Sequence, residues 1–220
     1  MIVISDMMGT LTTGSPVIGL VDWVRHNQSR LRANLYTAGV LPTYLLAKVG
    51  LLDWQKWGQR SMIDSLGLVR NATPETLEQI AEWSVEYNLW PERREDVLAR
   101  LEEYAQQGAQ VYIASSVFEP TVAAFAKRIG AQAIGTPLKI ENGRIGLATD
   151  LVSSQRKIGQ VLSQLGVERV DVAYGDTAQD VPLLENAVHP VAVYPDEALR
   201  AVALERGWEI FGERENMAQP

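Results

Sequence analysis

The sequence contains no cysteine, and this excludes disulfide bonds, thiolate metal sites and a cysteine nucleophile. It also lacks an uncharged apolar run long enough to cross a bilayer, because the longest candidate, Ala38 to Trp54, is interrupted by Pro42 and Lys48. The N-terminal MIVISD has neither the basic segment nor the apolar length of a signal peptide. We therefore expect a cytoplasmic protein.

Basic residues are scarce relative to acidic ones. The chain has 20 Lys and Arg against 27 Asp and Glu, a net charge of −7 and a pI near 5.0. This balance argues against partners that are held through an anionic backbone or surface, so we expect neither nucleic acid nor membrane as a partner. An anionic small molecule stays possible, because a bound metal ion reverses the local field. Nothing in the sequence indicates the oligomeric state.

The pattern of apolar residues changes along the 220 residues, of which 46% are hydrophobic. Met1 to Ser5 is a short β-branched run that is typical of a buried strand, and it ends at Asp6. From about Val17 to Glu86, apolar residues recur at spacings of three and four, which predicts helices. Beyond Pro91, strands and helices alternate, which predicts a mostly parallel sheet with helices on both faces.

The sequence therefore predicts an α/β, Rossmann-like core that is interrupted after its first strand by a helical insertion. We assign residues 1–14 and 87–220 to the core and 15–86 to the insertion. Removal of the insertion should leave a core that folds, because the insertion enters and leaves the core near one strand end. The elements predicted beyond the insertion are helices over Glu92–Gln107, Glu119–Ile129, Ser154–Leu165 and Asp196–Arg206, strands over Val111–Ala114, Val170–Tyr174 and Val191–Tyr194, and a hairpin over Leu138–Leu147.

Three polar residues lie at the carboxyl ends of predicted strands. They are Asp6, Ser115 and Asp176. In open parallel sheets, ligands bind outside the carboxyl ends of the strands. The sequence therefore predicts a functional site at this edge of the sheet.

Four segments occur in a fixed order: VISDMMGTLT, VYIASS, QRKIGQVL and VAYGDTAQDVPLL. Together they resemble the motifs of the haloacid dehalogenase superfamily, in the branch that includes phosphoserine phosphatase. The stretch VAVYPDEALRAVALERGWEI is also similar to the C-terminal strand and helix of that branch. The resemblance implies a helical cap formed by the insertion and hydrolysis of a small phosphorylated substrate through an aspartyl-phosphate intermediate.

The resemblance also implies roles for single residues. Asp6 matches the nucleophile, and Gly9 and Thr10 form the turn that follows it at the phosphate site. Ser115 matches the serine that donates a hydrogen bond to a phosphate oxygen, with the adjacent Ser116 as a competitor. Lys157 matches the lysine that neutralises charge on the nucleophile and the transferring group, although Arg156 is adjacent.

The fourth motif implies a magnesium ion. Asp176 and Asp180 match its acidic pair, and carboxylate oxygens suit Mg²⁺. In the family the metal is held by the nucleophile, by the main-chain carbonyl two residues later and by the acidic pair. These correspond to Asp6, Met8 and Asp176, with Asp180 acting directly, through water, or by orienting Lys157.

The pattern departs from the family at Met8, where an aspartate usually serves as the general acid and base. Methionine transfers no proton, and general acid–base catalysis is worth ~10²–10⁴-fold. Three readings stay open: a phosphatase impaired or specialised by Met8, a phosphate-ligand-binding relative without turnover, and a phosphonatase-like C–P hydrolase. The third would use Lys48 or Lys56 as a Schiff base.

The insertion offers further candidates. His26 is a possible substitute for the missing proton-transfer group. Candidate contacts for an anionic substrate group are Arg25, Arg30, Arg32 and Arg60. Phosphoserine itself is not favoured, because the stretch TTGSPVIG lacks the acidic residue that phosphoserine phosphatases carry soon after the first motif.

Overall fold

The structure, a computed structural model, describes residues 1–149, 151 and 154–213. Six strands form one sheet in the order β3-β2-β1-β6-β7-β8, and every neighbouring pair is parallel. This arrangement confirms the predicted Rossmann-like α/β class. The strands are β1 (Ile2–Ser5), β2 (Gln110–Phe118), β3 (Gln132–Thr136), β6 (Val170–Gly175), β7 (Ala187–Val193) and β8 (Glu209–Phe211).

Helices cover both faces of the sheet. Successive strand residues point to opposite faces, and both sets of side chains are apolar, so each face is buried under helices. On one face Val3 packs in a cluster with Leu101 of α5 (Glu95–Gln106) and Phe125 of α6 (Glu119–Arg128). On the other face Ile4 packs with Leu183 and Leu199. The helices of this second face are α7 (Ser154–Leu165), α8 (Val181–Glu185) and α9 (Glu197–Arg206). A short 3₁₀ helix, η3 (Ala178–Asp180), precedes α8.

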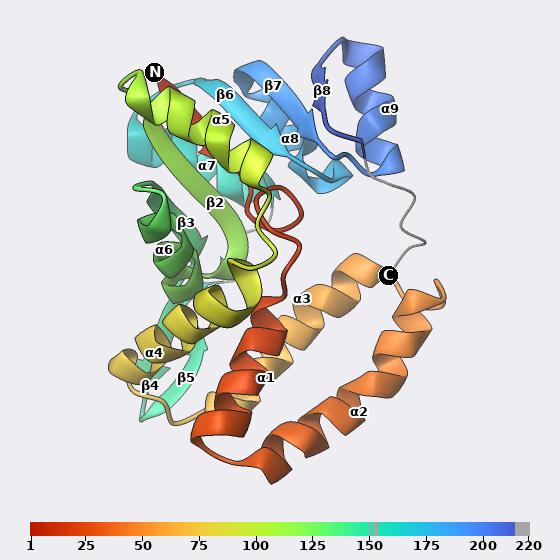
Figure 1. Ribbon diagram of the computed structural model, residues 1–220, viewed down its shortest axis with the longest axis vertical. Coiled ribbons are helices and arrows are strands. Elements are labelled where there is room, and N and C mark those ends of the chain that lie inside the picture. Colours follow the sequence, from red (N-terminus) through yellow and green to blue (C-terminus); the bar gives the residue numbers. More distant parts are fainter. Residues whose placement is uncertain (150, 152–153, 214–220) are drawn as a thin grey trace.

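The segment between β1 and α5 is helical, as predicted. It comprises α1 (Pro16–Asn27), α2 (Arg30–Lys48), α3 (Trp54–Ser65), the 3₁₀ helix η1 (Leu66–Val69), α4 (Pro74–Ser84) and the π-helical turn η2 (Val85–Leu89). Each α-helix begins at a side-chain N-cap, which is Ser15, Ser29, Asp53 or Thr73. In Figure 1 these helices lie below the sheet, with α2 along the outer edge.

The insertion has its own apolar cluster but is also joined to the core. Leu20, Trp23 and Ile80 belong to a cluster that lies almost wholly within the insertion. Met62 and Val85, in contrast, belong to the same buried cluster as the sheet residue Val3. The predicted boundary at residue 86 falls inside a continuous helical stretch, since η2 follows α4 without a break.

The hairpin β4 (Leu138–Glu141) and β5 (Arg144–Leu147) forms a separate two-stranded sheet, as predicted. Asn142 and Gly143 at its turn have φ angles of 52° and 70°, as a type I′ turn requires. The Ile145 N–H donates to the carbonyl of Arg70, 2.9 Å away, so the hairpin contacts the insertion.

Two strands were not predicted, and two are longer than predicted. β7 begins at Ala187 rather than at the predicted Val191. β3 and β8 are short, and Gly135 and the exposed Gln132 and Glu209 weaken their apolar pattern. β2 continues past the predicted end at Ala114 to Phe118, with a register shift between these two residues. Within the described part of the chain, no helix has both the length and the apolar character needed to span a membrane.

Candidate functional site

Asp6 lies at the carboxyl end of β1, the strand with neighbours β2 and β6 in the middle of the sheet. Its N–H donates to the carbonyl of Tyr174, 3.0 Å away, at the end of β6. The chain then turns sharply, because the N–H groups of Leu11 and Thr12 both donate to the Met7 carbonyl, at 2.9 and 3.2 Å. Asp6 is buried, as are Met7 and Leu11. The turn therefore fixes the backbone around the candidate nucleophile.

Gly9 brings this turn against the end of β6. Its φ is +85°, and a Cβ built there would lie 2.0 Å from Oδ2 of Asp176. No side chain fits such an approach, so only glycine is compatible with this position. The hydroxyl of the adjacent Thr10 donates to Oδ1 of Asp176 at 3.3 Å. The first and fourth motifs are thus in direct contact.

Asp180 holds the loop that carries Asp176. Its Oδ2 accepts hydrogen bonds from the N–H of Asp176, the N–H of Thr177 and the hydroxyl of Thr177, each at 3.3 Å. Thr177 and Asp180 form a capping box around η3. Gly175 permits this fold, since a Cβ there would lie 2.4 Å from Cβ of Asp180. One carboxylate oxygen of Asp180 is therefore engaged in fixing the loop.

The three carboxylates that the motifs predict meet at this edge of the sheet. Asp6, Asp176 and Asp180 are buried, and each offers an oxygen within 4.8 Å of those of the other two. Buried like charges at this separation repel one another strongly unless a cation compensates them. A set of oxygen ligands alone suits a hard divalent cation such as Mg²⁺. The residues present therefore fit a magnesium ion.

Ser115 and Ser116 lie in β2, beside the nucleophile strand. The last regular pair between β1 and β2 joins Ser5 to Ile113, two residues before Ser115. Ser115 is buried, and its hydroxyl accepts from the N–H of Val117 at 3.4 Å. Ser116 is half-buried, and its carbonyl accepts from the hydroxyl of Thr136 at 2.7 Å. Ser115 sits inside the strand rather than at its end, because β2 continues through the register shift.

Lys157 and Met8 are the remaining predicted residues. Lys157 falls in the first turn of α7, but its side chain lies outside the described residues, as does that of Arg156. Met8 is half-buried in the turn after Asp6 and forms an isolated bridge with Thr12. Its thioether offers no group for proton transfer.

Arg94 belongs to the surroundings of the nucleophile turn, although the sequence did not single it out. Its Nε donates to the carbonyl of Gly9 at 2.8 Å, and its own N–H donates to the carbonyl of Leu11 at 2.8 Å. The guanidinium lies 3.9 Å from the ring centroid of Tyr194. A pair of arginines after Pro91 carries no sequence signal that distinguishes Arg94 from Arg93.

The Tyr194 ring packs against the guanidinium of Arg94. Its hydroxyl donates to Asp96 at 2.5 Å, and this hydrogen bond raises the pKa of Tyr194 above its usual value. The φ of Tyr194 is +42°, a conformation uncommon for a bulky residue. Residues 94 to 96 and 194 therefore form a support for the turn that contains Gly9.

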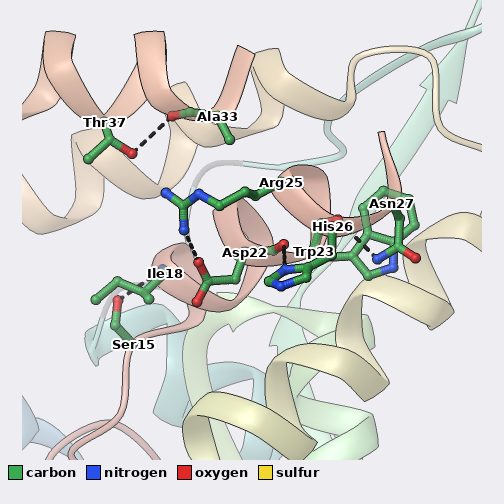
Figure 2. Close-up of polar contacts among 9 residues, drawn as sticks. All are labelled: Ser15, Ile18, Asp22, Trp23, Arg25, His26, Asn27, Ala33 and Thr37. Carbon is green, nitrogen blue, oxygen red and sulfur yellow. Dashed lines mark hydrogen bonds and ion pairs between the residues drawn. The ribbon is translucent and has the colours of Figure 1, made fainter. Parts of the chain in front are cut away.

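Five of the candidate residues of the insertion have partners on their own or neighbouring helices, namely Arg25, His26, Arg32, Arg60 and Lys56. Figure 2 shows Arg25 directed at Asp22, with which it forms an ion pair on α1. The His26 ring donates through Nδ1 to the Asp22 carbonyl at 2.8 Å and lies 5.3 Å from the ring of Trp83. Arg32 donates to the carbonyl of Leu68 at 2.6 Å, and Arg60 donates to Asp64 at 3.0 Å. Lys56 lies 3.7 Å from Asp53.

One contact joins the insertion to the loop of the fourth motif. The side-chain amide of Gln179, between Asp176 and Asp180, donates to Gln55 at 2.5 Å. Gln55 is in the first turn of α3. The start of α3 therefore lies beside the edge of the sheet where the carboxylates meet.

A parallel α/β sheet with three aspartates meeting at its carboxyl edge is the arrangement that the four sequence motifs predicted. The sequence matches the haloacid dehalogenase-like hydrolase family over residues 3–185. The chain belongs to this family, as the four motifs predicted.

Individual curated proteins resemble this chain only in part. The phosphoserine phosphatase SerB1 of Mycobacterium tuberculosis is 28% identical over 148 residues, which cover 60% of this chain and 44% of that protein. The chain spans less than half the length of the curated relatives it matches.

The fold is shared more widely than the sequence. A protein of unknown function from Bordetella pertussis Tohama I has a TM-score of 0.76 and 20% identity, and the match covers 96% of this chain and 97% of that one. A substrate-bound phosphoserine phosphatase has a TM-score of 0.61 and 15% identity, with 97% and 93% covered. The phosphoserine-phosphatase-like fold predicted from the sequence is confirmed.

Proposed function

We propose that this protein is a magnesium-dependent phosphatase that acts on a small phosphomonoester through Asp6. The observation that carries the proposal is the meeting of Asp6, Asp176 and Asp180 within 4.8 Å of one another, at the edge where Gly9 and Thr10 touch Asp176. Asp6, Asp176 and the main-chain carbonyl of Met8 would hold the Mg²⁺, with Asp180 close by. When bound, Mg²⁺ supplies positive charge that offsets the anionic nucleophile and phosphate.

Hydrolysis would proceed in two displacements on phosphorus. In the first, a carboxylate oxygen of Asp6 forms a bond to phosphorus, and the bond to the leaving-group oxygen breaks with its electron pair. In the second, water attacks phosphorus, the bond to Asp6 breaks, and inorganic phosphate leaves. Ser115 would donate to a phosphate oxygen, Lys157 would offset the developing charge, and Gly9 and Thr10 would line the phosphate site, with Ser116 as a further candidate.

Both displacements involve a proton that Met8 cannot move. An alkoxide leaving group must gain a proton, and the attacking water must lose one. Aryl and acyl phosphates leave without protonation, so the first displacement should run with these substrates. The second displacement should be slow, and the aspartyl-phosphate should accumulate.

The helical insertion, residues 15–86, would act as a cap over this edge. The hydrogen bond between Gln55 and Gln179 supports this, because it links α3 to the loop between Asp176 and Asp180. Such a cap would exclude water from the site and admit small substrates. Phosphoserine is not the substrate that we favour, since the stretch after the first motif lacks an acidic residue.

The test of this proposal is rapid-mixing kinetics with an aryl phosphate and Mg²⁺. We expect a burst of leaving group close to one equivalent of enzyme, followed by a slow steady state. Met8→Asp should raise the steady-state rate by ~10²–10⁴-fold, the range of acid–base assistance. Met8→Leu is the control, and it should leave the rate unchanged. Met7→Asp would not serve, because Met7 is fully buried.

Two results would count against it. Brisk turnover by the original protein with little gain in Met8→Asp would mean that another group, such as His26, moves the proton. Absence of both a burst and a rescue would favour a protein that binds phosphate ligands without turning them over. The observation that favours such a phosphate-binding protein is the methionine at position 8, where the family usually has an aspartate.

The metal assignment has a separate test. Asp176→Asn removes one negative charge from the cluster, and we expect Mg²⁺ affinity to fall by at least ~10-fold, since direct ligands and their supports carry effects of this size. Titration calorimetry of Mg²⁺ measures it in the absence of substrate. Asp64→Asn, on the exposed surface of α3, is the matched control and should bind Mg²⁺ as the original does. Equal affinities in all three proteins would remove the metal from the proposal.

A further inference from the structure

Large apolar side chains are exposed mainly on one segment of the molecule. Of the fifteen that are exposed in the described part of the chain, nine lie between residues 31 and 54. Leu31, Val49 and Leu51 are each about 70% exposed. We call these nine side chains the α2 surface: Leu31, Leu35, Leu41, Leu45, Leu46, Val49, Leu51, Leu52 and Trp54. A monomeric soluble protein rarely leaves so many neighbouring apolar side chains in water without a partner for them.

The spacing along α2 places these residues on one side of the helix. At 100° per residue, Leu31, Leu35, Leu45 and Val49 fall within the same half of the helix. The opposite side carries Ala33, Tyr36 and Ala47, which are buried or half-buried. The helix therefore uses a narrow face to pack on the protein and presents a broad apolar face outward. Figure 1 shows α2 at the outer edge of the molecule.

Basic residues border this apolar face, and acidic residues are missing from it. The same helical geometry places Arg30 and Lys48 on one border and Arg32 on the other. No Asp or Glu occurs from residue 23 to residue 52. Residues 23–52 contain four basic residues, because Arg25 adds to the three already named, so this segment has a charge of +4. Since the whole chain has a net charge of −7, the other residues together carry −11. The charge of the molecule is thus segregated.

Aromatic side chains lie at the end of α2 and the start of α3. The rings of Trp54 and Trp57 are stacked with centroids 5.3 Å apart, and Tyr44 lies 5.9 and 5.6 Å from them. The indole N–H of Trp57 donates to the hydroxyl of Thr43 at 3.1 Å. Tryptophan and tyrosine, with an apolar body and a polar tip, are enriched where proteins meet the headgroup layer of a bilayer.

We propose that the α2 surface docks this protein on an anionic lipid bilayer, with α2 lying in the plane of the interface. The combination of a broad apolar face, basic borders and terminal aromatics is the pattern of helices that lie in this layer. The net charge of the whole chain argues against such a partner, but the separated charge matters here, since lipid headgroups act within about one Debye length.

A second copy of the chain fits this surface less well. In a two-fold dimer the same patch meets itself, so the basic borders formed by Arg30 and Lys48 would face their own copies without acidic partners. An anionic lipid surface has the opposite charge to these borders. The docking end of α2 also lies beside the site, because Gln55 in the next helix contacts Gln179. The docking proposal itself does not depend on the proposed chemistry.

Vesicle flotation tests the docking. The full chain is mixed with vesicles of phosphatidylcholine alone or of phosphatidylcholine with phosphatidylglycerol. We expect binding to the anionic vesicles, weak binding to the neutral ones, and a decrease with added salt. The double variant Leu35→Glu with Leu45→Glu should lose ~10-fold or more of the binding, since it places two charges in the apolar layer. Arg30→Glu with Lys48→Glu should lose a comparable amount, on anionic vesicles only.

Leu204→Glu is the matched control, because Leu204 is as exposed as Leu35 but belongs to α9. This variant should bind vesicles as the original does. Thermal melts of every variant check that the fold is retained, and light scattering measures the oligomeric state without vesicles. Failure to bind anionic vesicles overturns the proposal. A dimer that the leucine variants dissociate, without vesicle binding by the original, overturns it too and assigns the surface to a second copy.

Discussion

The carboxyl edge of the sheet and the helical insertion are held together by different kinds of contact. At the edge, residues far apart in the sequence bind one another: Asp6 to Tyr174, Thr10 to Asp176 and Arg94 to Gly9. In the insertion, most ion pairs join residues three or four positions apart, and most are exposed, as in Arg60–Asp64 and Lys56–Asp53. Exposed pairs of this kind contribute little to stability. Substitutions should therefore cost more stability at the edge of the sheet than on the outer helices.

The largest effect is expected where the insertion joins the core. Deletion of residues 15–86 removes Met62, Leu66 and Val85, three members of the buried cluster beneath the sheet. At ~1.5–3 kcal/mol for each buried side chain, this is a loss of about 5–9 kcal/mol, comparable to the whole stability of a domain. The sequence alone predicted a core that folds without the insertion, but this shared packing leads to the opposite expectation. We expect the deletion variant to show no cooperative thermal transition.

A shorter deletion sharpens this prediction. Removing residues 30–65 and joining the ends with a short Gly/Ser linker takes away α2 and α3 but retains α1, η1 and α4. These retained elements keep most of the insertion's own cluster, including Leu20 and Ile80. We expect this variant to unfold cooperatively at a lower temperature. If the longer deletion also unfolds cooperatively, the insertion is independent of the core.

The next largest effect is expected at Gly9. In Gly9→Ala, the new methyl group would meet the carboxylate of Asp176, and the φ of +85° would be strained. We expect a loss of about 2–4 kcal/mol in the free energy of unfolding and a loss of Mg²⁺ binding. Gly39→Ala in α2 is the matched control, since a Cβ there meets nothing within 4 Å. It should stabilise the protein by about 0.5–1 kcal/mol.

Urea unfolding and Mg²⁺ titration of the two variants decide the matter. Similar stability and similar Mg²⁺ affinity in the two alanine variants would mean that the turn at Gly9 does not approach Asp176 as closely as the structure places it. Destabilisation by Gly39→Ala would instead point to a close neighbour of the exposed face of α2, such as a second copy.

The sequence alone predicted the parallel sheet and most of its helices, because apolar spacing and turn residues are local signals. The hairpin around Asn142 and Gly143 is the clearest case, since both residues adopt the positive φ that their types favour. β3 and β8 were not predicted from the sequence, because each is short and its extended conformation depends on pairing with a neighbouring strand. The same limit applies to the boundary at residue 86, since only the packed structure shows Val85 and Val3 in one cluster.

The sequence predicted those residues of the candidate site that belong to the four motifs. Asp6, Asp176 and Asp180 are close in space, as strand ends and the family resemblance indicated. The contact between Gly9 and Asp176 and the support from Arg94 were not predictable, because they join segments whose separation depends on the whole sheet. The roles of Ser115, Lys157 and Met8 in chemistry stay predictions.

The smallest effect, and the most specific to the edge, is expected at Arg94. Arg94→Gln removes a charge-assisted hydrogen bond to the Gly9 carbonyl and the contact with Tyr194. Arg100→Gln is a close match, because Arg100 donates to Glu209 at 2.6 Å and lies 4.2 Å from the ring of Phe211, away from the nucleophile turn. Arg94→Gln should lose about 1.5–3 kcal/mol of stability, which is the range for one hydrogen bond to a charged group. Arg100→Gln should lose less than about 1 kcal/mol, because its ion pair with Glu209 is exposed. Only Arg94→Gln should slow the burst with an aryl phosphate, by ~10-fold or more, because a displaced turn misplaces Asp6. The KM should change less than kcat, since Arg94 acts through the backbone of Gly9 and not on the substrate. Equal burst rates in the two variants would show that the turn keeps its shape without Arg94, and the support at this edge would then come from the hydrogen bonds of the turn itself.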